Sequence, residues 1–261
     1  MFRTGKIIWN HRHALSSQFV VDIKTTVATT KLGPLWWILD PLVLMAIYTF
    51  MIKIVFDRGG PNYHIFALCG IVTWQSFARA LNLSTGALRK NSSLIRQTSL
   101  PLQIYVLIPS IVQAFFYLIG LVIVACWNNS VLGWHTFAVL PLLLPMILLP
   151  FGLGLFLSVC DVYLSDTGKF LPYILRMGFY MSPVLYSVER INTLQNVPEV
   201  LKTLYNLNPM VHILSAVRDV LFIGNFFNFE TYFYVLVFSF VVVQLGIIFF
   251  NRQAPEIPKA L

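Results

Sequence analysis

The chain alternates between polar segments and long apolar runs, and the lengths of these runs decide its structural class. Runs of about 20 residues or more, long enough to cross a bilayer, lie at roughly 33–54, 64–83, 103–127, 135–160, 169–188 and 231–250. The preceding segment, 1–31, is polar and charged. This pattern predicts an all-α integral membrane protein with six transmembrane helices in one domain over 32–261.

Residues 13–31 of the polar segment carry a moderately apolar face. At about 3.6 residues per turn, five apolar residues fall within an arc of roughly 140°. They are Leu15, Phe19, Val20, Ile23 and Val27. We therefore expect an amphipathic helix that lies along the membrane surface. The alternative is an ordinary cytoplasmic helix that packs on other protein.

The segment 189–230, between the fifth and sixth runs, contains two shorter apolar stretches. Val200–Leu207 and Met210–Ile223 are too short to cross a bilayer and are divided by an Asn-Leu-Asn-Pro sequence that ends at Pro209. Apolar stretches of this length are typical of re-entrant or interfacial helices. We expect a re-entrant helix pair, with a small globular lobe as the alternative.

The fourth run is rich in residues that disturb helices. Pro141, Pro145, Pro150, Gly152 and Gly154 all lie within it. Membrane helices tolerate such residues where neighbouring helices satisfy the freed backbone groups. We expect a kinked and closely packed helix.

Composition supports the membrane class and argues against nucleic-acid binding. Only 11% of the residues are charged, about half of what a soluble domain carries. The net charge of +8 is spread over loops rather than gathered in one block. Most Lys and Arg residues fall on the side of the two termini, which places both termini in the cytoplasm. No removable signal peptide is evident at the N-terminus.

The three cysteines, Cys69, Cys126 and Cys160, all lie in apolar runs. Their odd number and wide spacing indicate neither a disulfide framework nor a metal site.

Two charged residues lie inside predicted spans. Asp40 lies roughly 12 Å into the first span and Arg176 roughly 10 Å into the fifth, counted from the same cytoplasmic side. Charges inside a membrane are usually paired or face water. We predict that Asp40 and Arg176 meet, within one subunit or between two, either as a structural ion pair or in a functional site. Separate solvation of each charge is the alternative.

The cytoplasmic connection 84–101 places two apolar residues among basic ones. We predict a short helix at about 91–100 that contacts a protein partner. The alternative is a solvent-exposed connecting loop. Asn91 or Ser92 can cap this helix. The candidate contact residues are Arg89, Lys90, Leu94, Ile95, Arg96 and Gln97.

Three motifs in this order resemble the permeases of the ABC-2 family. They are Leu-Gly-Pro-Leu-Trp-Trp-Ile-Leu-Asp-Pro ending at Pro41, Ser182-Pro-Val-Leu-Tyr186, and Asn206-Leu-Asn-Pro-Met210. The similarity covers nearly the whole chain and is greatest to the branch that exports O-antigen, capsule or teichoic-acid polysaccharides. It implies a homodimeric permease of the bacterial cytoplasmic membrane, driven by two copies of a separate ATPase subunit that binds ATP. This chain lacks a phosphate-binding loop of its own, so we expect no enzyme activity, cofactor or metal in it.

The resemblance also implies roles for individual segments. The surface helix and the short cytoplasmic helix would dock on the ATPase subunits. The substrate would be a glycan on a polyprenyl-pyrophosphate carrier, which passes along a channel with aromatic walls. The candidate channel residues are Trp37, Asp40, Tyr48, Trp74, Phe77, Arg79, Arg176 and Tyr180. Arg176 and Arg79 would meet the pyrophosphate, whereas many of the aromatic rings would instead face lipid.

One feature departs from the family pattern. Related permeases often carry an Arg-Asp pair before the fifth span, where this chain has Asp161 and Asp166 followed by Lys169. A role assigned to that arginine therefore cannot be transferred.

Other functional classes lack their expected signals. A secondary transporter usually shows internal repeats, and none is evident between 1–130 and 131–261. A membrane transferase would need clustered histidines and carboxylates, but His11 and His13 have no carboxylate nearby in the sequence. Export of another amphiphile, such as a drug or a lipid, stays open.

Overall fold

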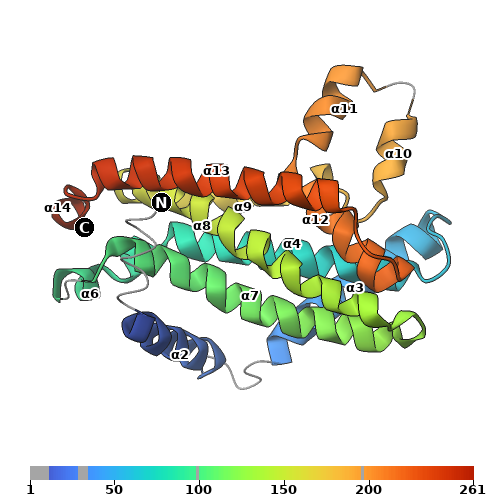
Figure 1. The fold of residues 1–261 in the computed structure, drawn as a ribbon, viewed down its shortest axis with the longest axis horizontal. Coiled ribbons are helices and arrows are strands. Elements are labelled where there is room, and N and C mark those ends of the chain that lie inside the picture. The colour runs from blue at the N-terminus through green and yellow to red at the C-terminus, as the bar shows by residue number, and fades with distance from the viewer. Residues whose placement is uncertain (1–11, 29–34, 98–99, 195–196) are drawn as a thin grey trace.

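The computed structural model describes residues 12–28, 35–97, 100–194 and 197–261. Every regular element in these ranges is helical. The long helices lie side by side, and short helices stand at both ends of the bundle (Figure 1). The prediction of an all-α membrane protein is confirmed at this level.

Four helical segments in the described ranges are long and apolar enough to cross a membrane. They are Trp36–Val55 (α3, Trp36–Thr49, with η2, Phe50–Val55), Leu102–Trp127 (α7), Trp134–Tyr163 (η4, Trp134–Ala138, with α8, Val139–Tyr163) and Phe229–Gln253 (α13). The second and fifth predicted spans coincide with α4 (Tyr63–Thr85) and α9 (Thr167–Met181). Helices therefore occupy all six predicted positions, but length and composition mark only four of them as candidate spans.

Helix α4 lies at the centre of the bundle. It packs against α3, α7 and α8, and most of its side chains from Tyr63 to Thr85 are buried. Its few interior polar groups are paired, as between the hydroxyl groups of Thr73 and Tyr117, 3.2 Å apart. Its neighbours thus cover it more completely than they cover α3, in which Pro41 alone is fully buried.

Helices α8 and α13 form a close contact through two glycines. A Cβ atom on Gly152 would lie 2.7 Å from the backbone nitrogen of Val243, and one on Gly246 would lie 2.5 Å from the carbonyl oxygen of Gly152. Small residues allow helix backbones to approach in this way. Pro145 and Pro150 lie within α8, so the fourth run is closely packed as expected.

Helix α2 (Arg12–Ala28) packs on protein. Leu15, Phe19 and Ile23 contact a buried row of four α7 residues. That row consists of Ile104, Ile108, Val112 and Phe116. Three of the five predicted apolar positions therefore lie against α7, whereas Val20 is 46% exposed and the Val27 side chain lies outside the described part of the chain. Contact of this helix with the membrane surface stays a prediction. Lys31 and the residues up to Pro34 lie outside the described ranges.

The segment between the last two long helices divides into two parts. Helices α10 (Val188–Thr193) and α11 (Glu199–Asn206) project from the bundle (Figure 1) and contain no buried residue. Helix α12 (Pro209–Arg218) is buried against α4 and α13 and continues as η5 (Asp219–Ile223). Only the second half of the predicted helix pair therefore enters the bundle.

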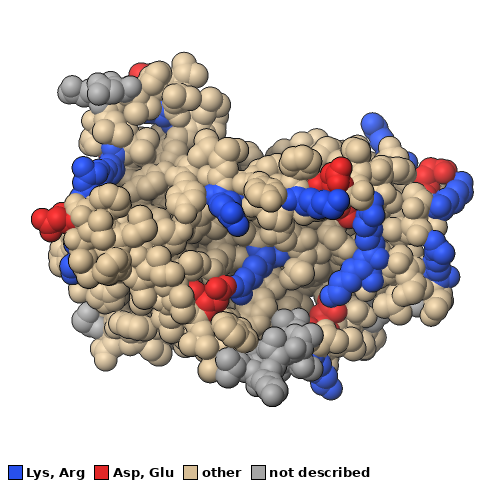
Figure 2. Space-filling view, turned by 180° about the vertical axis from the view of Figure 1, so that it is seen from behind, with Lys and Arg blue, Asp and Glu red and all other residues tan. Residues whose placement is uncertain are grey.

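Three short helices, α5 (Ala87–Lys90), α6 (Ser92–Gln97) and α14 (Ile257–Ala260), gather at one end of the bundle. Lys and Arg side chains are concentrated over this end (Figure 2). The same view shows a hollow in the middle of the face, with basic and acidic side chains beside it.

Candidate functional site

An ion pair joins the neighbouring helices α3 and α4. Asp40 on α3 forms an ion pair with Arg79 on α4, and the amide of Gln75, one turn before Arg79, lies 3.5 Å from the same carboxylate oxygen. The side chains are partly exposed, 46% for Asp40 and 30% for Arg79. The predicted pairing of Asp40 with Arg176 is wrong within this chain, because α3 packs against α4 and Arg176 lies on an exposed part of α9.

The ring of Trp37 packs next to this ion pair and contacts both Arg79 and Phe116. The guanidinium carbon of Arg79 lies 4.6 Å from the centre of the Trp37 ring, and the opposing neighbour is Phe116, stacked at 4.2 Å and 6°. Cation–π attraction and stacking both hold an indole ring in place. Trp37, Asp40 and Arg79 thus form one unit in which Arg79 serves two partners.

The other aromatic candidates form a second cluster, centred on α9. The hydroxyl oxygens of Tyr48 and Tyr180 are 3.0 Å apart. Phe179 lies between this pair and Trp74, with ring centres 5.6 Å from Tyr48 and 6.4 Å from Trp74. Phe77 continues the row, 5.7 Å from Trp74. The predicted aromatic residues therefore make a continuous path across three helices.

The members of this aromatic cluster differ in exposure. Trp74 and Phe77 are each 6% exposed, whereas Tyr180 is 57% exposed. Gly178 permits the close packing, because a Cβ atom there would lie 2.9 Å from the Trp74 ring. Tyr180 is thus the member whose ring is available at the surface, and Trp74 supports it from behind.

The exposed face of α9 is mostly apolar. Tyr173, Ile174 and Met177 are each more than half exposed, and the cationic Arg176 lies among them. An uncovered apolar helix face in a membrane protein contacts lipid or another protein chain.

A buried carboxylate anchors the short helix α5. Asp161, at the end of α8, is 5% exposed, and its Oδ2 lies 3.1 Å from Nε of Arg89 on α5. Arg89 also donates to the carbonyl oxygen of Asp161 at 2.8 Å, while the backbone amide of Gly168 donates to Oδ1 at 3.1 Å. One ion pair thus joins α5, α8 and the start of α9, and the sequence pattern did not indicate it.

The predicted contact residues on α6 are not equivalent. Ile95 is 7% exposed and packs with Leu88, Phe250 and Ile257, whereas Leu94 is 39% exposed. Lys90, Arg96 and Gln97 are exposed. The prediction that Leu94 and Ile95 form one exposed apolar pair is wrong, because successive helical residues point about 100° apart and α14 covers one of them.

Sequence reasoning missed Arg218, which it had counted as a loop charge. Arg218 is 5% exposed and donates to the carbonyl oxygens of Pro183 at 2.5 Å and Val184 at 2.6 Å. Its guanidinium carbon lies 3.6 Å from the centre of the Phe66 ring. Burial lowers the pKa of Arg218 to about 10. The only signal in the sequence was an arginine that ends a short apolar stretch.

Two of the sequence motifs meet beside Arg218. The side-chain amide of Asn208 donates to the hydroxyl of Ser182 at 3.2 Å, and its oxygen accepts from the amide of Met210 at 3.0 Å, which caps α12. The Ser-Pro-Val-Leu-Tyr turn after α9 is therefore fixed from two sides.

The described residues contain no group of three His, Cys, Asp or Glu that could hold a metal ion. The described parts of α3, α4 and α9 carry charged, aromatic and apolar side chains.

Comparison with known proteins gives matches over most of the chain. The family described as ABC-2 type transporter matches residues 18–222. The O-antigen export system permease protein RfbA of Klebsiella pneumoniae is 24% identical over 237 residues, 88% of each chain. The polysialic acid transport protein KpsM of Escherichia coli is 23% identical over 250 residues, 90% of this chain and 91% of that protein. The capsule polysaccharide export inner-membrane protein CtrC of Neisseria meningitidis is 22% identical over 243 residues.

Proposed function

The chain belongs to the ABC-2 type transporter family, and on this premise we propose that it is the permease subunit of an exporter of lipid-linked polysaccharide. The observation that carries the proposal is the similarity, over about nine-tenths of both chains, to permeases named for O-antigen and capsular polysaccharide export. The membrane would be the bacterial cytoplasmic membrane, with both termini in the cytoplasm.

The proposal treats all six long helical segments as spans. Helix α4 is surrounded by α3, α7 and α8, and a helix inside a bundle needs less apolar surface than one that faces lipid. Helix α9, although short, is flanked by the Asp161 anchor at one end and the Ser182 turn at the other.

Energy would come from two copies of a separate ATPase subunit that binds ATP. The end with α5, α6 and α14 is the proposed docking surface, since it carries exposed basic residues and the partly exposed Leu94. Closure of the ATPase subunits would reach α8 and α9 through the Arg89–Asp161 ion pair, since Asp161 also accepts a hydrogen bond from the backbone of Gly168 in α9.

The substrate path would lie between two copies of the chain. The exposed face of α9 and the adjoining α3 offer an uncovered apolar surface for a two-fold partner, the commonest closed arrangement. Tyr48 and Tyr180 would contact the passing sugars, and the Trp37–Asp40–Arg79 unit together with Arg176 would meet the carrier's pyrophosphate. In this scheme Asp40 holds Arg79 in position.

Export from a deletion strain tests the function. The strain would carry the chain together with a candidate ABC ATPase subunit, and surface glycan would be measured by immunoblotting. We expect restored surface glycan and co-purification of the ATPase. Accumulation of an unrelated amphiphile inside the deletion strain, with normal surface glycan, would assign the protein to another export substrate.

A further inference from the structure

A cavity of about 830 Å³ lies at the end of the bundle opposite α6 and α14. Its walls come from the end of η2, the loop 56–62, the start of α4 and the segment that joins α9 to α10. In Figure 1 these parts meet where the light-blue loop lies beside the foot of α10. None of the predicted channel or coupling residues lines it.

Aromatic side chains line the cavity, and two arginines lie at its edge. Phe56, Tyr63, Phe66 and Phe222 supply the aromatic wall. Arg58 and Arg190 also line it, and both are exposed. An apolar chamber with guanidinium groups at its edge matches an amphiphile that carries an anionic head.

The loop that shapes the cavity is firmly folded. The amide of Arg58 donates to the carbonyl oxygen of Ile52 at 2.8 Å, and the hydroxyl of Tyr63 donates to that of Leu185 at 2.9 Å. Asp57 and Asn62 adopt positive φ values of 47° and 57°, a conformation that costs energy in residues other than glycine. The two opposite walls are therefore tied together.

The charged side chains that line the cavity are both cationic. No carboxylate lines the cavity, and within the described part of the chain neither Arg58 nor Arg190 takes part in an ion pair. Behind the Phe66 ring lies Arg218, whose donors are directed to backbone carbonyl oxygens. Two guanidinium groups thus line the cavity and a third lies behind one of its rings, while Asp57 and Glu189, next to the lining arginines in the chain, do not line it.

The position of the cavity indicates which kind of anionic ligand it would bind. It lies where η2 and α9 end and α4 begins, so it lies at the level of the headgroups if these helices span the bilayer. Ile54 and Val55, beside it on η2, are 68% and 59% exposed, as expected for side chains that meet lipid. A soluble phosphate would leave the ring wall without a partner, whereas a lipid would cover it.

We propose that this cavity binds one anionic phospholipid of the surrounding bilayer, with its phosphate at Arg58 and Arg190 and its acyl chain along the aromatic wall. Arginine suits phosphate because its planar fork donates two parallel hydrogen bonds. The bound lipid would join α3, α4 and the turn after α9 from outside. The proposal rests on the membrane location and not on the identity of the exported substrate.

Native mass spectrometry of the detergent-purified full chain, titrated with phosphatidylglycerol or phosphatidylcholine, tests this site. We expect the chain to retain phosphatidylglycerol preferentially. The double variant Arg58→Gln, Arg190→Gln should bind it about tenfold more weakly, since two charge-assisted contacts are lost. Arg252→Gln, which removes an exposed charge from the far end of α13, is the matched control and should leave binding unchanged.

A second variant fills the cavity without changing charge. A Cβ atom on Gly60 meets nothing within 4 Å, so Gly60→Trp can be accommodated and should also displace the lipid, with the melting temperature as the fold control. Equal retention of the two lipids by the wild-type chain, or unchanged phosphatidylglycerol binding in both variants, would overturn the proposal. Efficient disulfide formation between two copies through Arg190→Cys, independent of lipid, would show an interface between copies instead.

Discussion

Asp40 and Arg79 form an ion pair that joins α3 to α4, and the same arginine covers the ring of Trp37. Few residues of α3 are fully buried, and this pair is one of the few polar connections that hold it to the bundle. A charge swap can separate its structural role from a role in binding the substrate.

Asp40→Arg and Arg79→Asp alone should each lower the amount of folded protein, because a hydrogen-bonded charge pair contributes about 1.5–3 kcal/mol. The combined swap should restore the protein. Restored export as well would show a purely structural pair, whereas restored protein without export would show that Arg79 itself contacts the substrate. Asp166→Asn, in the exposed pair with Lys169, is the control and should be nearly neutral.

Arg89→Gln and Asp161→Asn should separate ATP hydrolysis from export. Removal of either partner leaves the other without its ion pair, and the connection from α5 to α8 and α9 is weakened. We expect ATP hydrolysis by the purified complex with little surface glycan. Glu199→Gln, from the ion pair with Lys202 on α11 away from the proposed docking surface, is the matched control. Normal export by both variants at normal protein level would remove the pair from the coupling path.

Leu94 and Ile95 should behave differently when each is replaced. Ile95→Ala leaves a cavity in the packed cluster and should lower stability by about 2–5 kcal/mol. Leu94→Asp changes a partly exposed side chain, so the protein should fold but should bind the ATPase subunit less well. Thermal melting and co-purification distinguish the two effects. Loss of ATPase binding in Ile95→Ala at temperatures where it stays folded, with normal binding by Leu94→Asp, would contradict this assignment.

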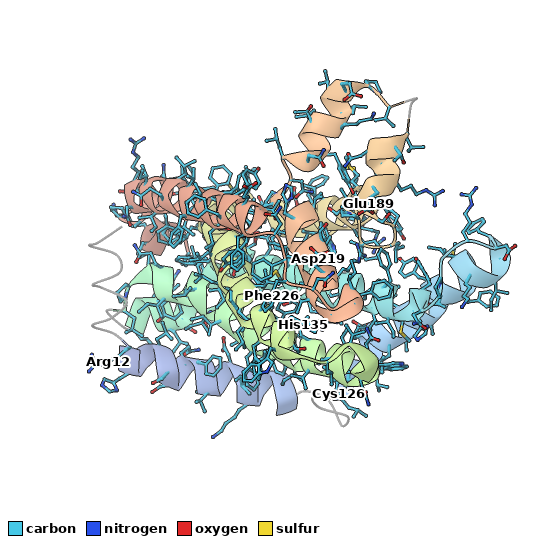
Figure 3. The ribbon with its side chains drawn as sticks, turned by 45° about the vertical axis from the view of Figure 1, so that its right-hand side comes forward. Arg12, Cys126, His135, Glu189, Asp219 and Phe226 are labelled. Atoms are coloured by element: carbon cyan, nitrogen blue, oxygen red, sulfur yellow. The ribbon has the colours of Figure 1, made fainter. Side chains whose placement is uncertain are left out.

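Asp219 should make stability depend on pH. Burial, with a smaller contribution from Glu189, raises the pKa of Asp219 above its ordinary value of 3.8; Figure 3 shows both residues on the same side of the bundle. A raised folded-state pKa gives stability that is fully present below the unfolded-state value and is lost as pH rises through the folded-state value. Asp219→Asn should therefore melt at a higher temperature than the wild type at pH 7, and the difference should vanish in acid. A difference in melting temperature that is the same in acid as at pH 7 would contradict this assignment.

Cross-linking tests the proposed dimer. In a background with Cys126 and Cys160 replaced by Ser, a cysteine at Tyr173 or Ile174 on α9 should join two copies in membranes. A cysteine at Leu245, equally exposed on α13, is the control and should cross-link poorly. Strong cross-linking through Leu245 alone would place the partner on the opposite face.

Part of the candidate site followed from the sequence. Seven of the eight residues proposed for the channel fall into two groups, because Trp37, Asp40 and Tyr48 lie on one helix and Trp74, Phe77 and Arg79 on the next, whereas Arg176 lies apart on an exposed part of α9. The spacing of residues along each helix predicts which side chains lie at a similar depth in the membrane. Depth alone could not decide whether Arg79 or Arg176 is the partner of Asp40.

The sequence by itself determined the class of protein, the positions of the six long helices and the family, because run length, charge content and motif order are properties of the linear chain. The tertiary structure decided the rotation of each helix about its axis and the identity of its neighbours. These two quantities buried Ile95 but not Leu94, placed Arg79 beside Asp40, and buried Arg218 against Phe66. Helix contacts join residues far apart in the chain, so no local pattern records which side chains will meet.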